Sequence, residues 1–392
     1  MGFKGLVIRS YDGQFDRARV VDLERRCEVG PSKRVFLFTD TLGDPICRIR
    51  NSPLYKMLVA EWEKELVGVI QGSIKTVVAG GHKAAPSFPA KVGYILGLRV
   101  APPYRHRGIG SSLVRHLEHW FSFNDVDYSC MATHKDNHAS LNLFINNFRY
   151  IKFRTARILA NPVTNRPYQI DPSKIKIQRL KIEEAEAIYK KHMATAEFFP
   201  KDINSILRNK LSLGTWMAYY SAGAGGDFSG EKGETPASWA VVSLWNSGEV
   251  FKLRLGKAPV AWIIYTKSLK FVDKILPWLK VGSVADFFEP FGFYFVYGVH
   301  HEGPFSGRLV RALCQYVHNM ALKSRDCKVI VTEIGGEDDV LKKEIPHWKL
   351  LSCPQDLWCI KGLKSNNGDH NHLLEWTKAP PNRALFVDPR EV

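Results

Sequence analysis

The stretch RVAPPYRHRGIGSSL, residues 99–113, joins a strand-like segment to an amphipathic one. The preceding residues, VGYILGLRV at 92–100, are rich in the β-branched and aromatic types that favour a strand. The residues that follow repeat apolar side chains at a period near 3.6, which predicts a helix beginning at Gly108 or Ile109. The turn between the two segments therefore lies at a helix N-terminus.

This turn suits an anion. The aligned peptide dipoles of a helix N-terminus act like about half a positive charge. Glycine at 108 and 110 lets a phosphate approach the backbone N–H groups, and Arg105 and Arg107 add positive charge. A dinucleotide fingerprint would need a third glycine where Leu113 stands, and the Gly-Lys-Ser/Thr of a P-loop is missing from the sequence. The alternative is a plain helix start with solvated arginines.

Composition limits the class of protein. A chain of 392 residues predicts two domains, and 45% hydrophobic with 24% charged residues is typical of a folded globular protein. The net charge of +16 favours anionic partners, such as nucleic acid, acidic proteins or a phosphorylated cofactor. The basic residues are scattered and form no known DNA-binding motif. Direct nucleic-acid binding is therefore the weakest of the functional hypotheses.

Two features concern the cellular compartment. No uninterrupted apolar run approaches the roughly 20 residues of a spanning helix, and the first residues do not resemble a signal peptide. We therefore expect no membrane partner and a location inside the cell. The seven cysteines contain no C-x-x-C pair, so neither a disulfide framework nor a zinc ribbon is indicated, and we expect reduced core or strand residues.

The first half predicts alternating strands and helices. In chain order these are a strand at 6–10, a helix at 15–27, a hairpin over 55–78 that turns near 63–65, the strand at 92–100, the helix after the opening turn, a strand at 127–133, a short helix at 140–145 and a strand pair near 150–160. Residues 161–173 carry three prolines and little apolar periodicity, which indicates a linker. We therefore divide the chain into units at 1–160 and 174–392.

The second half repeats this order in outline. It predicts a strand at 175–180, a helix at 183–192, a hairpin of 237–246 with 249–255, a strand at 291–299, a helix containing Leu309 and Leu313, a strand at 327–334, and a final helix and strands. The Gly- and Ser-rich insertion at 221–235 predicts a surface loop. An apolar patch in the tail, residues 380–392, is expected to dock on the fold or on a partner.

The motif R-x-x-G-x-G at 105–110, directly after a strand that ends in V-x-P, resembles the pyrophosphate-binding motif of the GNAT superfamily of N-acetyltransferases. Residues 136–153 resemble the second cofactor segment of that superfamily. The sequences of residues 96–114 and 150–163 more closely resemble the plant HOOKLESS-like probable N-acetyltransferases. This resemblance extends over nearly the whole chain. The resemblance implies an α/β (α+β) fold with tandem GNAT-like domains, a mixed central sheet flanked by helices, and a degenerate second copy.

The resemblance also implies acetyl-CoA as co-substrate and assigns its contacts. The backbone of Leu98, Arg99 and Val100 would bind the pantetheine arm as an added strand, with one N–H near the thioester oxygen. The pyrophosphate would be held by Arg105, His106, Arg107, Gly108, Ile109, Gly110 and Ser111. Asn137, Ser140 and Phe144 would line the far side of the cofactor near the sulfur.

The proton-transfer residues depart from the family pattern. The general acid is commonly a tyrosine in the second segment, but Leu143 and Phe144 occupy the candidate positions. Tyr94 stands where the histone-modifying members carry a glutamate, and a tyrosine with a pKa near 10 is a poor base. The other candidate bases are Glu61, Glu63, His134 and Asp136, each of which also fits a solvated or hairpin position.

Two functions follow from these observations. The first is an acetyl-CoA-dependent N-acetyltransferase that modifies a protein lysine, an N-terminal amine or a small amine. The resemblance implies a regulator of plant growth and development, and it favours the nucleus over the cytoplasm as its location. The second is a non-catalytic GNAT-fold regulator that acts by binding CoA or proteins, since the usual tyrosine is missing. Acceptor choice is expected in the loop at 79–91 and in the second unit.

Other groups of potentially functional residues give weaker indications of a site. The pairs His116 with His119 and His134 with His138 are expected to be solvated rather than metal ligands, because a third ligand is not evident and no metal is expected. In the second half, the loop at 300–307 places Glu302 near the position of Arg105, where a carboxylate would repel phosphate.

Overall fold

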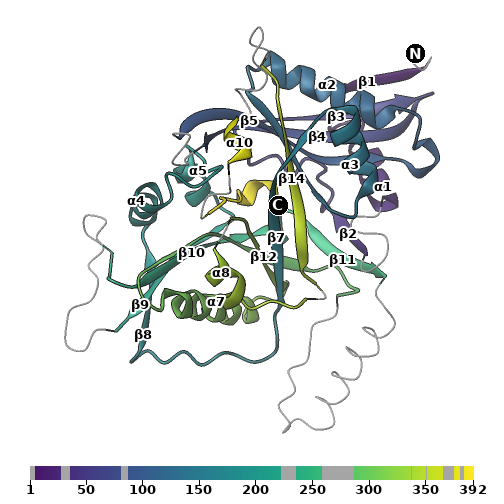
Figure 1. Cartoon of the computed structure of the whole chain (residues 1–392). Coiled ribbons are helices and arrows are strands. Elements are labelled where there is room, and N and C mark those ends of the chain that lie inside the picture. The colour runs from purple at the N-terminus through teal and green to yellow at the C-terminus, as the bar shows by residue number, and fades with distance from the viewer. Residues whose placement is uncertain are drawn as a thin grey trace.

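The computed structural model describes residues 5–27, 36–80, 87–221, 235–257, 287–336, 338–349, 351–364, 375–379 and 384–392. Within these ranges, one sheet of twelve strands crosses the molecule (Figure 1). Its strand order is β1-β3-β4-β5-β6-β14-β7-β13-β12-β10-β9-β8. A separate two-stranded sheet joins β2 (Phe36–Asp40) to β11 (Lys252–Lys257).

The strands of the large sheet fall into two series. The first half supplies β1 (Leu6–Ser10), β3 (Leu54–Trp62), β4 (Glu65–Ala79), β5 (Phe88–Val100), β6 (Tyr128–His134) and β7 (Ile151–Pro162). The second half supplies β8 (Ile175–Leu180), β9 (Ser212–Tyr220), β10 (Trp239–Asn246), β12 (Gly292–Glu302), β13 (Cys327–Ile334) and β14 (Cys353–Gly362).

The last strands of the two halves are exchanged. β14 lies between β6 and β7 of the first half, and β7 pairs on its other side with β13 of the second half. Each half therefore completes its sheet with the final strand of the other, and the sheet is continuous across the linker. The division of the chain at 161–173 stays a prediction.

The helices cover both faces of the sheet. On one face α2 (Ile109–Phe123) and α7 (Ser306–Leu322) each bury an apolar stripe on the strands of their own half. The opposite face carries a third core, which includes residues of α1 (Arg17–Arg26), α4 (Ile182–His192), α5 (Ile203–Leu207) and the C-terminal tail. The shorter helices are α3 (His138–Leu141), α8 (Asp339–Glu344) and α10 (Glu375–Lys378).

The two halves share an irregularity at the same place. β5 and β12 are each parallel to the strand that follows the next long helix, β6 and β13. Each then carries a glycine with a φ of +61°, Gly97 and Gly298, at a register shift against its antiparallel neighbour. A positive φ at a bulge favours glycine. The fold is therefore the expected α/β arrangement, with a large mixed sheet flanked by helices and two halves that share one order of elements.

Two predicted elements were wrong. Residues 249–255 form no hairpin with 237–246, because β10 pairs with β9 and β12, while β11 pairs with β2. The segment 150–160 is one long strand, β7, rather than a strand pair, because β14 and β13 supply its two neighbours. The loop expected at 79–91 is shorter than predicted, because β4 continues to Ala79 and β5 already begins at Phe88. Residues 81–86 of this loop and residues 222–234 of the predicted insertion lie outside the described residues.

The remaining structural expectations concern cysteines and membranes. All seven cysteines lie in described ranges and are free thiols, five buried and two half-buried. Among the helices that the structure describes, none is long and apolar enough to span a membrane.

Candidate functional site

The loop between β5 and α2 exposes a row of backbone donors. His106 and Gly108 have φ values of 62° and 75°, so the chain turns twice through the left-handed region before α2 begins. In the described structure, the N–H groups of residues 106–111 donate no hydrogen bond to another protein group. Unpaired N–H groups at a helix N-terminus form a ready anion site.

The loop also concentrates positive charge. Arg105 and Arg107 are exposed, and the Arg107 guanidinium lies 5.6 Å from the ring centre of Tyr104. The Arg105 Nε donates to the Val100 carbonyl at 3.2 Å, which fixes the side chain beside the strand end. A Cβ at Gly110 would meet Leu143 at 3.7 Å and Val100 at 3.9 Å, which is ordinary contact. Gly110 therefore leaves room beside the loop.

The end of β5 separates from β6. In the described chain these two parallel strands are paired from Val92 to Ile95, and β5 continues past the bulge while remaining paired with β4 on its other side. Leu98, Arg99 and Val100 are half-buried on the diverging part. The Arg99 Nε is held by Glu24 at 3.2 Å. Such a divergence leaves a strand edge to which an extended ligand can pair.

The second predicted cofactor segment lies close to this loop. Asn137 caps α3 by accepting from the Ser140 N–H at 3.2 Å and donates to the Thr133 hydroxyl at 3.0 Å. Leu143 lies at Gly110, as described above, in a π-helical turn over Asn142–Asn147. Phe144 is buried instead, with its ring packed edge-on against Tyr150 at 5.2 Å. Leu143, rather than Phe144, is the residue of this segment that borders the loop.

Two of the predicted bases lie at the end of β3 and in the turn that follows it. Glu61 accepts from Arg9 at 2.9 Å and from Arg19 at 2.6 Å, and the hydrogen bond from Arg9 is the main cause that lowers its pKa. A lowered pKa weakens a carboxylate as a base. Glu63 is exposed in the turn between β3 and β4, with a φ of 49°.

The other predicted bases lie nearer the divergence of β5 and β6. Tyr94 is buried on β5, and burial, with nearby carboxylates, raises its pKa well above the usual value. It therefore stays a neutral phenol. The Nδ1 of half-buried His134, at the end of β6, accepts from the backbone N–H of Asp136 at 3.1 Å, and Asp136 itself is exposed.

Two carboxyl groups of the second half were not predicted as site residues from the sequence. Asp356 of β14 lies directly opposite His134 of β6, and Glu333 of β13 accepts from the Trp358 indole at 2.8 Å. Burial, together with the charge of Asp356, raises the pKa of Glu333 to about 8, and burial raises that of Asp356 to about 7. A base is most effective when its pKa lies near the working pH.

This pair reaches the first half because of the strand exchange. The charges of Glu333 and Asp356 both act on the Tyr94 phenol, and the Tyr94 ring lies 6.0 Å from that of Trp358. The sequence signal is a lone acid inside each of two strand-like segments, CKVIVTEI and PQDLWCI. Such residues are seldom buried unless they are paired.

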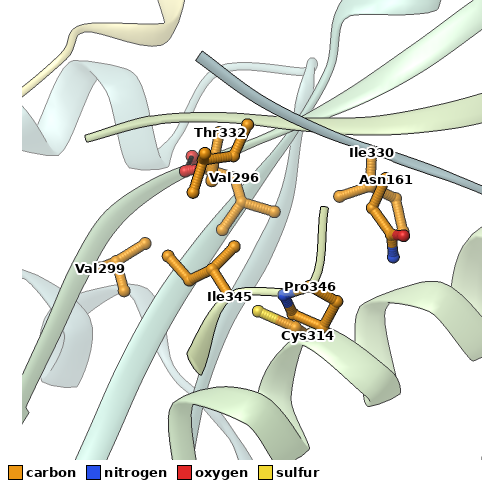
Figure 2. A pocket seen from close by; sticks show the side chains of 9 residues that line it. Asn161, Val296, Val299, Cys314, Ile330, Thr332, Ile345 and Pro346 are labelled. Atoms are coloured by element: carbon orange, nitrogen blue, oxygen red, sulfur yellow. Dashed lines mark hydrogen bonds between the residues drawn. The ribbon is translucent and has the colours of Figure 1, made fainter. Parts of the chain in front are cut away.

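In the second half, the place that corresponds to the divergence of β5 and β6 is filled by side chains. On one face Ile345 and Pro346 close over the strands, leaving a cavity of about 20 Å³, roughly the room of one water (Figure 2). On the other face Leu385 of the tail forms bridges to Gly335, just past β13, and to Glu197. Leu385, Phe386 and Val387 are buried there, so the apolar patch of the tail docks on the fold as expected.

Comparison with known proteins agrees with this geometry. Residues 18–148 match the acetyltransferase (GNAT) family model. The chain is 46% identical over 404 residues to "Probable N-acetyltransferase HLS1" of Arabidopsis thaliana, covering 98% of this chain and 99% of that protein. The chain belongs to the GNAT acetyltransferase family. It is also 35% identical over 425 residues to "Acetyl transferase GW6a" of Oryza sativa subsp. japonica, covering 98% and 97%.

A solved structure is similar to this chain in fold. The GNAT chain is similar to Saccharomyces cerevisiae N-myristoyltransferase with bound myristoyl-CoA, with a TM-score of 0.56 and 10% identity, over 92% of this chain and 80% of that one. At this identity the likeness concerns the fold alone. Family membership supports an acyltransferase function that uses an acyl-CoA donor and an acceptor.

Proposed function

We propose that this protein transfers the acetyl group of acetyl-CoA to a primary amine of a protein or a small molecule. The observation that carries the proposal is the row of unpaired N–H groups at 106–111, beside the diverging end of β5. The pyrophosphate would bind this row and Arg105, while the pantetheine would pair with the backbone of Leu98, Arg99 and Val100. Asn137 and Ser140 would stand on the other side.

The reaction needs a donor to the carbonyl oxygen, a base for the amine and an acid for the thiolate, and we assign the first two to the protein. The amine nitrogen forms a bond to the thioester carbon as the C–S bond breaks, and a backbone N–H at 98–100 donates to the carbonyl oxygen as negative charge develops there. The amine must first lose the proton of its ammonium form. We assign this proton to the carboxyl pair of Glu333 and Asp356, which replaces the candidate bases Glu61, Glu63 and His134. The leaving thiolate takes a proton from solvent, because Leu143 and Phe144 cannot donate one.

Titration calorimetry with acetyl-CoA tests the cofactor site. We expect one molecule bound per chain, because the second half is closed by its tail. A Gly110→Glu variant should lose binding, since its carboxylate would repel the pyrophosphate. A Gly110→Ala variant is the matched control, because a Cβ fits there without displacing a neighbour, and should keep most of the affinity. Absence of heat with the wild type at high acetyl-CoA concentration would refute the site.

Release of free CoA thiol then separates catalysis from binding. Wild-type protein with acetyl-CoA and a panel of lysine peptides, N-terminal peptides and polyamines should release thiol above the rate without acceptor. Acetyl-CoA binding with no turnover across the panel would favour the second candidate, a non-catalytic regulator. The observation that favours this candidate is Leu143 at the position where the family commonly places its acid.

A role in plant growth and a nuclear location complete the proposal. Both rest on the resemblance to the plant relatives, and the net charge of +16 is compatible with the nucleus. Imaging of the tagged full-length protein tests the location, and a uniformly cytoplasmic signal would contradict it.

A further inference from the structure

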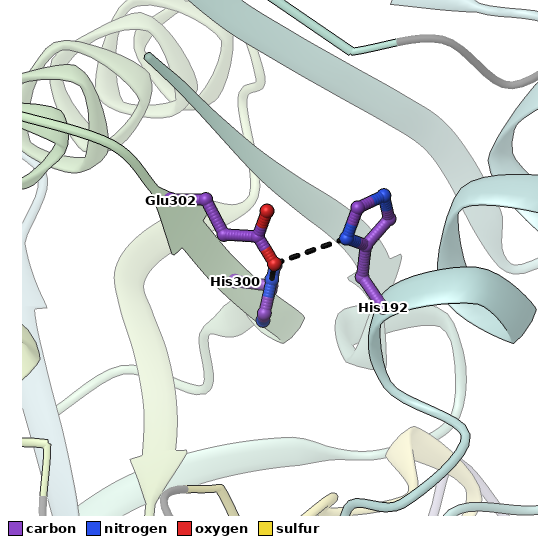
Figure 3. A group of neighbouring side chains, drawn as sticks. All are labelled: His192, His300 and Glu302. Atoms are coloured by element: carbon purple, nitrogen blue, oxygen red, sulfur yellow. Dashed lines mark hydrogen bonds and ion pairs between the residues drawn. The ribbon is translucent and has the colours of Figure 1, made fainter. Parts of the chain in front are cut away.

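Three potential ligands meet at the end of β12, remote in sequence from the acetyl-CoA loop. His192 is the last residue of α4, and His300 and Glu302 are two residues apart on β12, so both project from one face of the strand. The His192 Nδ1 and the His300 Nε2 each lie 3.0 Å from the same carboxylate oxygen, Oε1 of Glu302 (Figure 3). The three ligand atoms lie within 4.8 Å of one another.

These atoms form the donor set of a zinc site. Two imidazole nitrogens and one carboxylate are a common three-ligand set for Zn²⁺, with bonds of about 2.0–2.2 Å and a fourth position for water. Tetrahedral ligands at that bond length lie roughly 3.3 Å apart. The observed 3.0 Å separations need to widen by only a few tenths of an ångström. The two ring nitrogens lie within 4.8 Å of each other and have to approach to roughly 3.3 Å, so taking up an ion also requires one imidazole to move toward the other.

The surroundings hold the imidazoles and leave an entry. The buried ring of Trp239 packs edge-on against His192 at 4.8 Å and lies 5.3 Å from His300. The histidine side chains are 11% and 12% exposed, whereas that of Glu302 is 40% exposed, so an ion could reach the cluster from the carboxylate side. The carbonyl end of α4 also favours a cation.

The comparison of the two halves gives a reason for a cation here. The residues that precede α2 and α7, Gly108 and Phe305, both adopt the left-handed conformation. Three residues before them stand Arg105 in the first half and Glu302 in the second. The same place in the fold thus carries an arginine beside the N–H groups of 106–111 in the first half. In the second half it carries a carboxylate beside two imidazoles.

We propose that His192, His300 and Glu302 bind a divalent transition-metal ion of the zinc type, which fastens the end of α4 to β12. The carboxylate and the two ring nitrogens that face it would be the protein ligands, and water would complete the coordination. The site is separate from the acetyl-CoA loop, so it can exist whether or not the protein is a transferase.

Zinc titration of the full-length protein, first dialysed against a chelator, tests the proposal. We expect one tight Zn²⁺ per chain by calorimetry. His192→Gln and Glu302→Gln should weaken binding at least tenfold, since even partners of zinc ligands contribute about 10–100-fold. The chain has 13 histidines, so His116→Gln and His119→Gln, on exposed positions of α2, are matched controls and should bind zinc as the wild type does.

Two further measurements protect the test from misfolding. Thermal unfolding of each variant without metal should match the wild type, and Zn²⁺ should raise the melting temperature of the wild type but not of His192→Gln. If one variant fails to fold, His300→Gln replaces it. Co²⁺ should give the visible absorption of a tetrahedral site in the wild type only. Weak or no zinc binding by the wild type, or equal binding by wild type and site variants, would overturn the proposal.

Discussion

Asp356 is buried and Glu333 is half-buried, and the charge of Asp356 makes Glu333 harder to ionise. Burial and the neighbouring carboxylate both favour the protonated form of Glu333. The other candidate, Glu61, has a lowered pKa because Arg9 and Arg19 bind it. At the scale of single residues, environment therefore separates a carboxyl pair that can accept a proton near neutral pH from a carboxylate that is held in an ion pair.

The pH dependence of turnover tests this assignment. The base must be ionised, so kcat/KM should rise with pH and level off above a pKa of about 8. Glu333→Gln should lower the rate by about 10²–10⁴-fold. Asp356→Asn removes a neighbouring negative charge, so the inflection should move to lower pH. The control is Glu63→Gln in the exposed turn, which should keep both rate and profile. An unchanged profile in Glu333→Gln would exclude this residue as the base.

At the scale of elements, the C-terminal tail joins the two halves through buried charges. Lys75 of β4 pairs with Asp388 at 3.3 Å and Glu391 at 2.8 Å, and Arg390 binds both Asp388 and Asp202. Burial lowers the pKa of Lys75, but the two carboxylates raise it more, so it stays charged. The tail is therefore held at one end in the second half by Leu385 and at the other by β4.

Removal of this lysine should destabilise the fold. Lys75→Met leaves buried Glu391 without its ion-pair partner and Asp388 with Arg390 alone, and breaking a buried pair in this way costs about 3–5 kcal/mol. Chemical unfolding should show this loss relative to the wild type. Lys64→Met, in the exposed turn after β3, is the matched control and should change stability by less than about 0.5 kcal/mol. Equal stability of both variants would show that the tail network contributes little.

At the scale of the whole molecule, the strand exchange couples the two halves. β14 cannot leave the sheet without exposing β6 and β7, and β7 cannot leave without exposing β13 and β14. The buried backbone groups of these strands would lose their partners, which is costly. Neither half can therefore unfold alone while the other keeps a complete sheet.

We accordingly expect one cooperative unfolding transition for the full chain. Circular dichroism and tryptophan fluorescence should give coincident urea curves, which is a test of two-state behaviour. The tryptophans are divided between the halves, with Trp120 in α2 and Trp239 in β10, so the fluorescence reports on both. Two separated transitions would mean that the halves unfold independently.

Much of the local structure follows from sequence alone. The apolar period of residues 109–121 predicts α2, and the glycines and arginines at 105–110 predict an anion-binding turn, because these properties depend on residues close together in the chain. Most of the element order follows in the same way, although β2, α5 and β9 were not predicted. Which strands pair with each other does not follow from local sequence, as the wrong prediction of a hairpin between 237–246 and 249–255 shows.

The sequence by itself determined the glycine- and arginine-rich turn at 105–110, the GNAT resemblance and most of the repeated order of elements, since each depends on contiguous residues. Only the tertiary structure decided which acids lie together. The charge of Glu333 acts on Tyr94, and His192 hydrogen-bonds Glu302, because strands and helices from distant parts of the chain pack side by side. Contacts of that kind depend on long-range strand pairing and burial, which local periodicity does not encode.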